Sequence, residues 1–297
     1  MTQTAGATPS GVVQKLQTPT GHYAMLALDQ RESMRGMFGR LADGAFVGDD
    51  ALRTFKRQAI ATLSPYASAV LIDRPFGLGS SRPAELAPDP GLIVAIDVLH
   101  QVPGEDISHI TFDDLVTVEL LRQVGADAIK LLVLWHPQSG KAERAELVER
   151  AMNRAAEAGV ATLIEGIVGP EPDKSWAGEA ERHDAILACA QELVAYSPDI
   201  YKAQVPGYTP GDLSEVAAQS KLMSAIVVGD WVVLSNGVER DHFAPAVAQA
   251  TLGGASGFLA GRAIWADAVP EDDPAEALRD RSIGRLKALT AIVDGES

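Results

Sequence analysis

Eight apolar runs of strand length recur along the chain, and helix-like segments separate them. Most runs are apolar at consecutive positions, which is typical of strands buried on both faces of a parallel sheet. This alternation predicts the α/β class and a single-domain (β/α)8 TIM barrel, with a doubly wound open sheet as the alternative. The runs span residues 23–29, 68–74, 91–98, 128–135, 161–168, 200–206, 231–238 and 257–262. The helix-like segments span residues 49–63, 112–124, 141–158, 178–195, 211–225 and 241–252.

The length of the chain permits either one domain or two. Its 297 residues correspond to about two domains of ordinary size, but α/β barrels routinely hold roughly 200–250 residues around one core. No Pro/Ser-rich linker and no block of like charges divides the sequence. We therefore expect one domain over residues 1–297, with a short N-terminal arm through Val12 and a C-terminal helix near 275–294.

Candidate helix ends support these boundaries. Thr111 and Asp241 are plausible N-caps, because their side-chain oxygens can accept a hydrogen bond from the first helical turn. Gly125 and Gly159 stand where a helix would end in a residue of positive φ, which glycine adopts at little cost.

The charge balance restricts the partners. Lys and Arg number 25 against 40 Asp and Glu, so the formal net charge is −15, which opposes binding to nucleic acid or to an anionic membrane.

We expect neither a signal peptide nor a membrane span, because the first dozen residues lack a basic start and no apolar run reaches about 18 residues. The single thiol, Cys189, cannot form an intramolecular disulfide, and a cytoplasmic location follows as the simplest expectation. A homo-oligomer is expected by analogy with other barrels.

Four charged residues stand inside otherwise apolar strands: Asp29, Lys130, Glu165 and Lys202. Each alone has a structural explanation, such as a helix cap for Asp29, an ion pair for Lys130 and Glu165, or an exposed strand end for Lys202. In a TIM barrel, however, residues at the C-terminal strand ends converge on one mouth, and a lone charge in a dry core costs several kcal/mol. The four residues together therefore predict a site, and Asp97 is a further polar candidate at that mouth.

Two lysines beside two carboxylates suit amine catalysis on a ketone. A lysine must lose its proton to attack a carbonyl, and burial and a second cation both lower its pKa. We therefore expect Lys202 to form an iminium ion with Lys130 beside it, while Asp29 and Glu165 transfer protons. A barrel isomerase or epimerase and a non-catalytic sugar-phosphate binder are the rival interpretations.

Several segments carry a family resemblance. They are AMLALDQRESMRGMF (24–38), LSPYASAVLID (63–73), DAIKLLVLW (127–135), DIYKAQVPGY (199–208), VVLSNGV (232–238) and GASGFLAGRAIWA (254–266). The chain resembles the class I tagatose-bisphosphate aldolase family, and within it the sulfofructose-phosphate aldolases. The resemblance implies a TIM barrel that cleaves a ketose 1-phosphate through a Schiff base on Lys202, without a metal or other cofactor. Lys130, Glu165 and Asp29 would complete the acid–base set.

The resemblance also implies where the substrate binds. Its phosphate would lie against Ser235, Gly237, Gly261 and Arg262, and the loops after the last two strands of a TIM barrel commonly bind phosphate. A second anionic group, a sulfonate or a phosphate, has the candidate partners Gln30, Arg31 and Arg74, although solvated or ion-paired arginines explain the last two equally well. The favoured substrate is 6-deoxy-6-sulfofructose 1-phosphate, cleaved to dihydroxyacetone phosphate and sulfolactaldehyde, with tagatose or fructose 1,6-bisphosphate as the alternative.

Three features depart from the family pattern, and one of them is the exit of the second predicted strand, DRPFGLGSS (73–81). Gln204 stands where these aldolases usually carry Glu, two residues after the Schiff-base lysine, and Gly166 stands where the sulfosugar enzymes favour Pro. The six histidines show no zinc-binding spacing, so no metal site is predicted.

Overall fold

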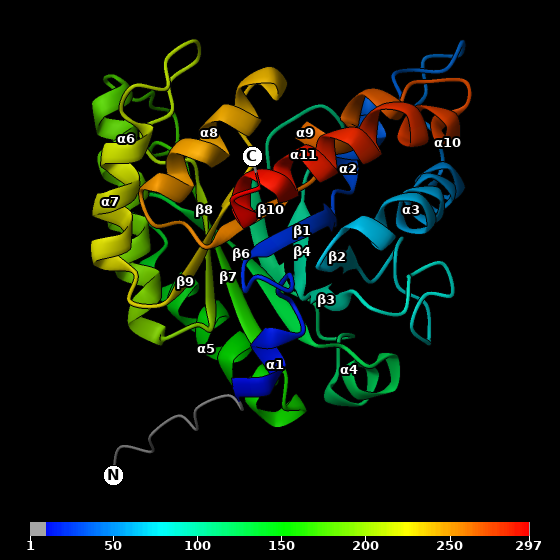
Figure 1. The fold of residues 1–297 in the computed structure, drawn as a ribbon, viewed down its shortest axis with the longest axis horizontal. Coiled ribbons are helices and arrows are strands. Elements are labelled where there is room, and N and C mark those ends of the chain that lie inside the picture. Colours follow the sequence, from blue (N-terminus) through cyan, green and yellow to red (C-terminus); the bar gives the residue numbers. More distant parts are fainter. Residues whose placement is uncertain (1–9, 297) are drawn as a thin grey trace.

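The barrel strands form one closed parallel sheet. In the computed structural model, which describes residues 10–296, the strand order is β1-β10-β9-β8-β7-β6-β3-β2, and β1 closes the ring by pairing with both β10 and β2 (Figure 1). This closure confirms the predicted TIM barrel and excludes the open sheet. The strands are β1 (Tyr23–Leu28), β2 (Ala69–Asp73), β3 (Gly91–Ala95), β6 (Ala128–Trp135), β7 (Ala161–Val168), β8 (Ile200–Gln204), β9 (Asp230–Leu234) and β10 (Gly257–Ala260).

Helices surround the barrel. Figure 1 shows α5, α6 and α7 on one side of the strands and α2, α3 and α4 on the other. The predicted C-terminal helix is divided into α10 and α11, which a π-helical turn (Leu278–Ser282) joins, and most of the predicted N-terminal arm lies outside the described residues. The helices are α1 (Ser10–Gln14), α2 (Glu32–Met37), α3 (Asp49–Leu63), α4 (Val118–Val124), α5 (Lys141–Ala158), α6 (Glu179–Leu193), α7 (Val216–Ile226), α8 (Arg240–Leu252), α9 (Arg262–Trp265), α10 (Pro274–Ala277) and α11 (Ile283–Asp294).

The helix ends match the sequence signals in part. Gly125 and Gly159 end α4 and α5 with φ of 63° and 76°, as predicted. Thr111 is not a cap, because it lies in a strand; the side chain of Thr117 caps α4 by accepting a hydrogen bond from the Leu120 backbone N at 3.1 Å. The expectation for Asp241 is also wrong, because α8 begins one residue earlier and Asp241 lies in its first turn.

The barrel interior is closed at the N-terminal end of the strands. Small and medium apolar side chains such as Ala69, Ala128 and Ala161 fill it, and Leu16, which follows α1, is fully buried among them. Gly91 at the start of β3 allows this close approach, because a Cβ there would lie 2.6 Å from Cδ2 of Leu16. With this end plugged, the open end is the C-terminal one, where barrel enzymes place their sites.

An antiparallel hairpin, unforeseen from the sequence, follows β3. It consists of β4 (Asp97–His100) and β5 (His109–Phe112), with His100 directly opposite His109. The predicted strand 91–98 therefore ends at Ala95, and the predicted helix 112–124 begins only at Val118. The two histidine rings stack with centroids 3.8 Å apart and planes 9° from parallel.

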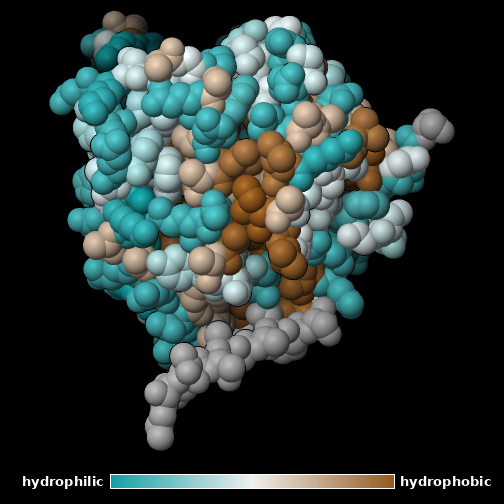
Figure 2. Space-filling view, turned by 90° about the vertical axis from the view of Figure 1, so that its left-hand side faces the viewer, coloured by the Kyte–Doolittle hydropathy of each residue, from teal (hydrophilic) through white to brown (hydrophobic). Residues whose placement is uncertain are grey.

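The helical surface carries exposed apolar residues. Figure 2 shows a hydrophobic band on the face where α6 and α7 lie. Leu222 of α7 is 50% exposed. Such a surface suits protein contacts, but the predicted homo-oligomer stays a prediction. Within residues 10–296, every helix is too short or too polar to span a bilayer.

Candidate active site

Lys130 lies at the centre of a buried cluster of charges. It is the third residue of β6, is fully buried, and points its ammonium at three carboxylates from other strands or strand ends. Its Nζ lies 2.6 Å from Oδ2 of Asp29, 2.8 Å from Oδ2 of Asp97 and 3.3 Å from Oε2 of Glu165. The ammonium donates a hydrogen bond to Asp97, and Asp29 and Glu165 complete the ion-pair cluster around it.

Lys202 lies beside this cluster. Glu165 in β7 is directly opposite Lys202 in β8, so the two side chains project from neighbouring strands on the same side of the sheet. Lys202 Nζ is 3.0 Å from Oε2 of Glu165, the same oxygen that Lys130 contacts. The structure therefore brings together all four charged residues that the sequence singled out, on the inner side of the barrel mouth.

The two lysines differ in the number of carboxylates that surround them. Burial alone would lower the pKa of Lys130, but Asp29, Asp97 and Glu165 outweigh it and hold that pKa above its usual range. Burial alone would raise the pKa of Asp29, but Lys130 and Lys202 outweigh it and hold that pKa below its usual range. Lys130 is thus a fixed cation, whereas Lys202 has one carboxylate within ion-pair distance among the described residues.

A second set of charges lies behind the first. Nη2 of Arg31 donates to Oδ1 of Asp97 at 3.0 Å, and its Nε lies 3.6 Å from Oδ2 of Asp73, which also pairs with buried Lys56. Oδ2 of Asp97 accepts from Lys130 and, at 2.9 Å, from the backbone N of Leu132. Asp97 therefore links the outer charges to the inner cluster, a role that its place at the end of an apolar run only hinted at.

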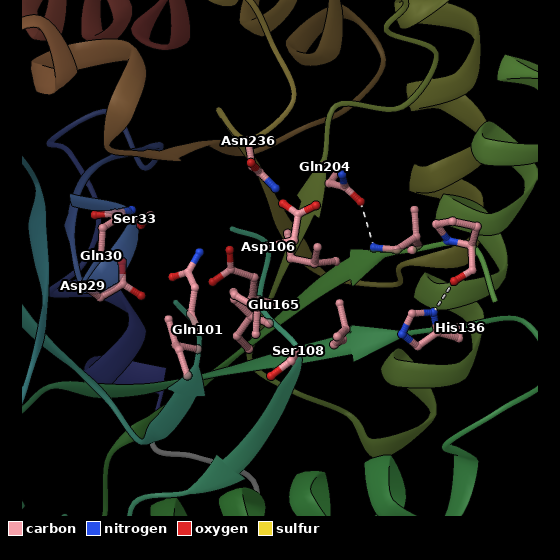
Figure 3. A pocket seen from close by; sticks show the side chains of 18 of the residues that line it. Asp29, Gln30, Ser33, Gln101, Asp106, Ser108, His136, Glu165, Gln204 and Asn236 are labelled. Atoms are coloured by element: carbon pink, nitrogen blue, oxygen red, sulfur yellow. Dashed lines mark hydrogen bonds between the residues drawn. The ribbon is translucent and has the colours of Figure 1, made fainter. Parts of the chain in front are cut away.

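A cavity of about 510 Å³ opens above the cluster (Figure 3). Figure 3 shows Glu165 in the middle, Asn236 and Ser108 on opposite sides of it, and His136 at the side away from Asp29. The lining residues are Asp29, Gln30, Ser33, Leu99, Gln101, Asp106, Ile107, Ser108, Leu132, Leu134, His136, Glu165, Ile167, Val168, Gly169, Pro170, Pro172, Gln204, Asn236 and Arg262. The hairpin β4–β5 and its loop thus form one wall of the cavity.

Arg262 is a lining cation without a carboxylate within ion-pair distance among the described residues. It hydrogen-bonds Oδ1 of Asn236, and burial lowers its pKa despite the opposing effect of Glu165 and Asp29. Such a partly desolvated guanidinium suits an anionic ligand. Asn236, which the sequence did not single out, stands inside the VVLSNGV segment.

The other predicted phosphate-binding residues adjoin this point but do not line the cavity. Ser235 is buried, and Gly237 has a φ of +78°, so the two flank Asn236 in the turn after β9. Gly261 precedes Arg262, and a Cβ there would lie 2.6 Å from the Ala27 carbonyl oxygen. Gly261 therefore sets the backbone path that brings Arg262 to the mouth.

The residues predicted for a second anion are placed differently. Arg31 is buried against Asp97 and Asp73, and Nε of Arg74 donates to Oδ2 of Asp113 at 2.7 Å; neither lines the cavity. The expectation that these arginines face the ligand does not fit the geometry, because carboxylates from neighbouring elements hold both. Gln30 does line the cavity, and its Oε1 is buried without a hydrogen-bond partner.

Gln204 also faces the cavity. Its Oε1 accepts a hydrogen bond from the Val168 backbone N at 2.9 Å, which leaves its amide NH2 available as a donor. Within residues 10–296, no group of three or more His, Cys, Asp or Glu side chains has an arrangement that could hold a metal ion. The acidic residues at the mouth converge on an ammonium instead.

A closed parallel barrel with two buried lysines among carboxylates at its mouth has the layout of an enzyme that works through a lysine amine. Residues 23–267 match the family model described as DeoC/LacD family aldolase. The chain therefore belongs to the DeoC/LacD family of aldolases, and the protein is a lyase.

Individual relatives agree with the family assignment. The tagatose 1,6-diphosphate aldolase 2 of Enterococcus faecalis is 26% identical over 297 aligned residues, which cover 91% of this chain and 86% of the relative. The tagatose 1,6-diphosphate aldolase of Listeria monocytogenes is 26% identical and covers 95% of this chain and 90% of its own length.

Solved structures agree on the fold. An archaeal fructose 1,6-bisphosphate aldolase covers 96% of this chain and 98% of its own, with a TM-score of 0.64 at 14% identity. A Schiff base forming fructose-1,6-bisphosphate aldolase gives the same TM-score at 15% identity, covering 95% of this chain and 98% of its own. At such identities the likeness shows the barrel and nothing further.

Proposed function

We propose that the protein is a Schiff-base aldolase that cleaves a ketose 1-phosphate to dihydroxyacetone phosphate and a three-carbon aldehyde. The observation that carries the proposal is the position of Lys202. The residue is 3% exposed, and its amine shares one oxygen of Glu165, which lines the cavity, with a lysine that stays charged. The names of the relatives, which concern tagatose and fructose bisphosphates, support a ketose phosphate as substrate.

The proposed reaction begins when the neutral amine of Lys202 adds to the C2 carbonyl. The carbinolamine loses its oxygen as water after a carboxylic acid protonates it, and an iminium ion remains. A carboxylate then removes the proton of the C4 hydroxyl, the C3–C4 bond breaks, and its electron pair moves to the iminium to give an enamine and the aldehyde. Protonation of the enamine at C3 and hydrolysis of the imine release dihydroxyacetone phosphate and restore Lys202.

Each residue of the cluster has a place in this scheme. Glu165 contacts both lysines and is the nearest proton carrier to Lys202, and Asp29 is the second. Lys130 remains a cation and pairs with the same oxygen of Glu165 as Lys202 does. Arg262 and Asn236 would hold the phosphate.

We include 6-deoxy-6-sulfofructose 1-phosphate in this proposal as one candidate substrate. Tagatose and fructose 1,6-bisphosphate are the other candidates. All three carry a second anion, and of the side chains predicted to hold it only Gln30 lines the cavity. Steady-state assays of the three compounds will rank them.

Borohydride trapping tests the reaction class. We expect reduction in the presence of dihydroxyacetone phosphate to leave a covalent adduct on Lys202, found by peptide mass spectrometry, and no turnover by Lys202→Met. Lys221→Met changes an exposed lysine of α7 and is the matched control, with trapping and turnover unaffected. A proton-transferring isomerase or a binding protein would give no adduct, and full turnover by Lys202→Met would refute the proposal.

A further inference from the structure

The order of the strands fixes which parts of the mouth face each other. In the ring, β10 lies opposite β6, and β9 lies opposite β3. Arg262 and Asn236 follow β10 and β9, so they lie across the mouth from His136 after β6 and from Ser108 in the hairpin after β3. Figure 3 shows the same opposition between Asn236 and Ser108.

This opposition gives a bound substrate a direction. A ketose with its 1-phosphate at Arg262 and its ketone at Lys202 of β8 follows the order of the strands when its remaining carbons extend toward β7, β6 and the hairpin. The far carbon, C6, then enters the half of the cavity that β6, β7 and the hairpin line.

That half of the cavity is largely apolar. Leu134 lies after Lys130 in β6, and Ile167 lies after Glu165 in β7. Pro170 lies just beyond the end of β7. The polar members of this half include Ser108, Gln101 and the carboxylate of Glu165, and none of them is an Arg or a Lys. The apolar members are Leu99, Ile107, Leu132, Leu134, Ile167, Val168, Pro170 and Pro172.

Positive charge is confined to the other half. Among the described residues that line the cavity, Arg262 is the sole Arg or Lys. Nδ1 of His136 lies 2.6 Å from the Pro170 carbonyl oxygen, which can only accept, so Nδ1 carries a hydrogen and this edge of the ring is already occupied. Asp106 of the hairpin loop lies near Asn236 in Figure 3 and its charge acts on Arg262, so it belongs to the Arg262 half of the cavity.

On the basis of the proposed function, we propose that the far end of the substrate is uncharged. The cavity would select a ketose 1-phosphate whose C6 carries hydrogen or a hydroxyl group, and would discriminate against a 6-phosphate or a 6-sulfonate. An anion placed among Leu134, Ile167 and Pro170 would lose its hydration without gaining a cation. The aldehyde product would then be neutral, unlike the product of a bisphosphate.

A matched substrate panel tests this inference. Fructose 1-phosphate and 6-deoxyfructose 1-phosphate represent the neutral end, and fructose 1,6-bisphosphate and 6-deoxy-6-sulfofructose 1-phosphate the charged end; the tagatose series repeats the comparison with the other C4 configuration. We expect kcat/KM to be at least about tenfold higher for the neutral compounds in whichever series is cleaved. Equal or higher kcat/KM for a charged compound would overturn the inference.

Designed variants make the test sharper. Ser108→Lys places a cation in the far half, and we expect it to raise kcat/KM for the charged compounds relative to the neutral ones by about tenfold over Ser108→Gln, the uncharged control of similar length. Equal ratios in the two variants would count against the inference. So would a wild-type activity on charged compounds that disappears in His136→Gln, because a protonated His136 would then be the missing cation.

The two proposals fail in different ways. If no compound of the panel is cleaved and none leaves a borohydride adduct on Lys202, the proposed function itself is wrong. If the adduct forms but charged compounds are preferred, only the inference about the far end is wrong.

Discussion

At the residue scale, Asp97 decides how the fixed cation is held. It joins Lys130 to Arg31 through its two oxygens, at 2.8 and 3.0 Å. We expect Asp97→Asn to lower the free energy of unfolding by about 2 kcal/mol, because two buried cations lose a charged partner. We also expect kcat to fall roughly tenfold or more, with a shift in the pH profile of kcat, because Lys130 would lose its proton more easily.

Urea unfolding and pH-dependent kinetics measure these effects, and Asp113→Asn is the control. Asp113 pairs with Arg74 outside the cavity, so its loss is expected to affect stability but not the pH profile. An unchanged profile in Asp97→Asn would reduce Asp97 to a purely structural role.

The same residues show how much of the site could be predicted from the sequence. Charged residues in apolar strands identified Asp29, Lys130, Glu165 and Lys202, because a charge at such a place needs partners whatever the detailed packing. The pairing of Arg31 could not be predicted, because its partners come from strands far away in the chain and its side chain could equally have turned into the cavity.

At the element scale, the hairpin β4–β5 is what the sequence did not reveal. A parallel barrel leads one to expect a helix after each strand, whereas residues 97–112 form an antiparallel pair that walls the cavity. By contrast, β6, β7, α3 and α5 have the predicted bounds, because long periodic segments bury one consistent face. The hairpin is short, half exposed and polar, so its pairing depends on contacts that periodicity does not record.

We expect the stacked pair His100 and His109 to make this hairpin sensitive to pH. Burial and the neighbouring ring lower the pKa of His100 below its usual 6.5, so the folded hairpin favours the neutral ring. That stabilisation is complete above about pH 6.5 and is lost as the pH falls below it. We expect KM to rise below pH 6.5 as the cavity wall loosens, and to rise less in His109→Phe, which keeps a stacked ring but cannot be protonated. Parallel KM profiles for the two proteins would refute this expectation.

At the scale of the whole molecule, the barrel could be predicted because eight apolar runs leave few ways to bury so much strand. The sequence did not predict which side chains face each other across the mouth, because this depends on the strand order and on the hairpin. The expected homo-oligomer and cytoplasmic location also stay predictions.

The net charge of −15 acts on every approach of an anionic substrate. The general field repels a phosphate, whereas Arg262 attracts it only at short range inside the cavity. Added salt screens charges beyond about 10 Å at 0.1 M, so it weakens the long-range repulsion more than the local contact. We therefore expect kcat/KM to rise roughly threefold between low salt and 0.15 M, while kcat stays constant. The measurement uses a salt of large, weakly binding ions, because sulfate or phosphate would compete at Arg262. A fall in kcat/KM over this range would mean that local attraction dominates, and that the acidic surface does not limit access to the cavity.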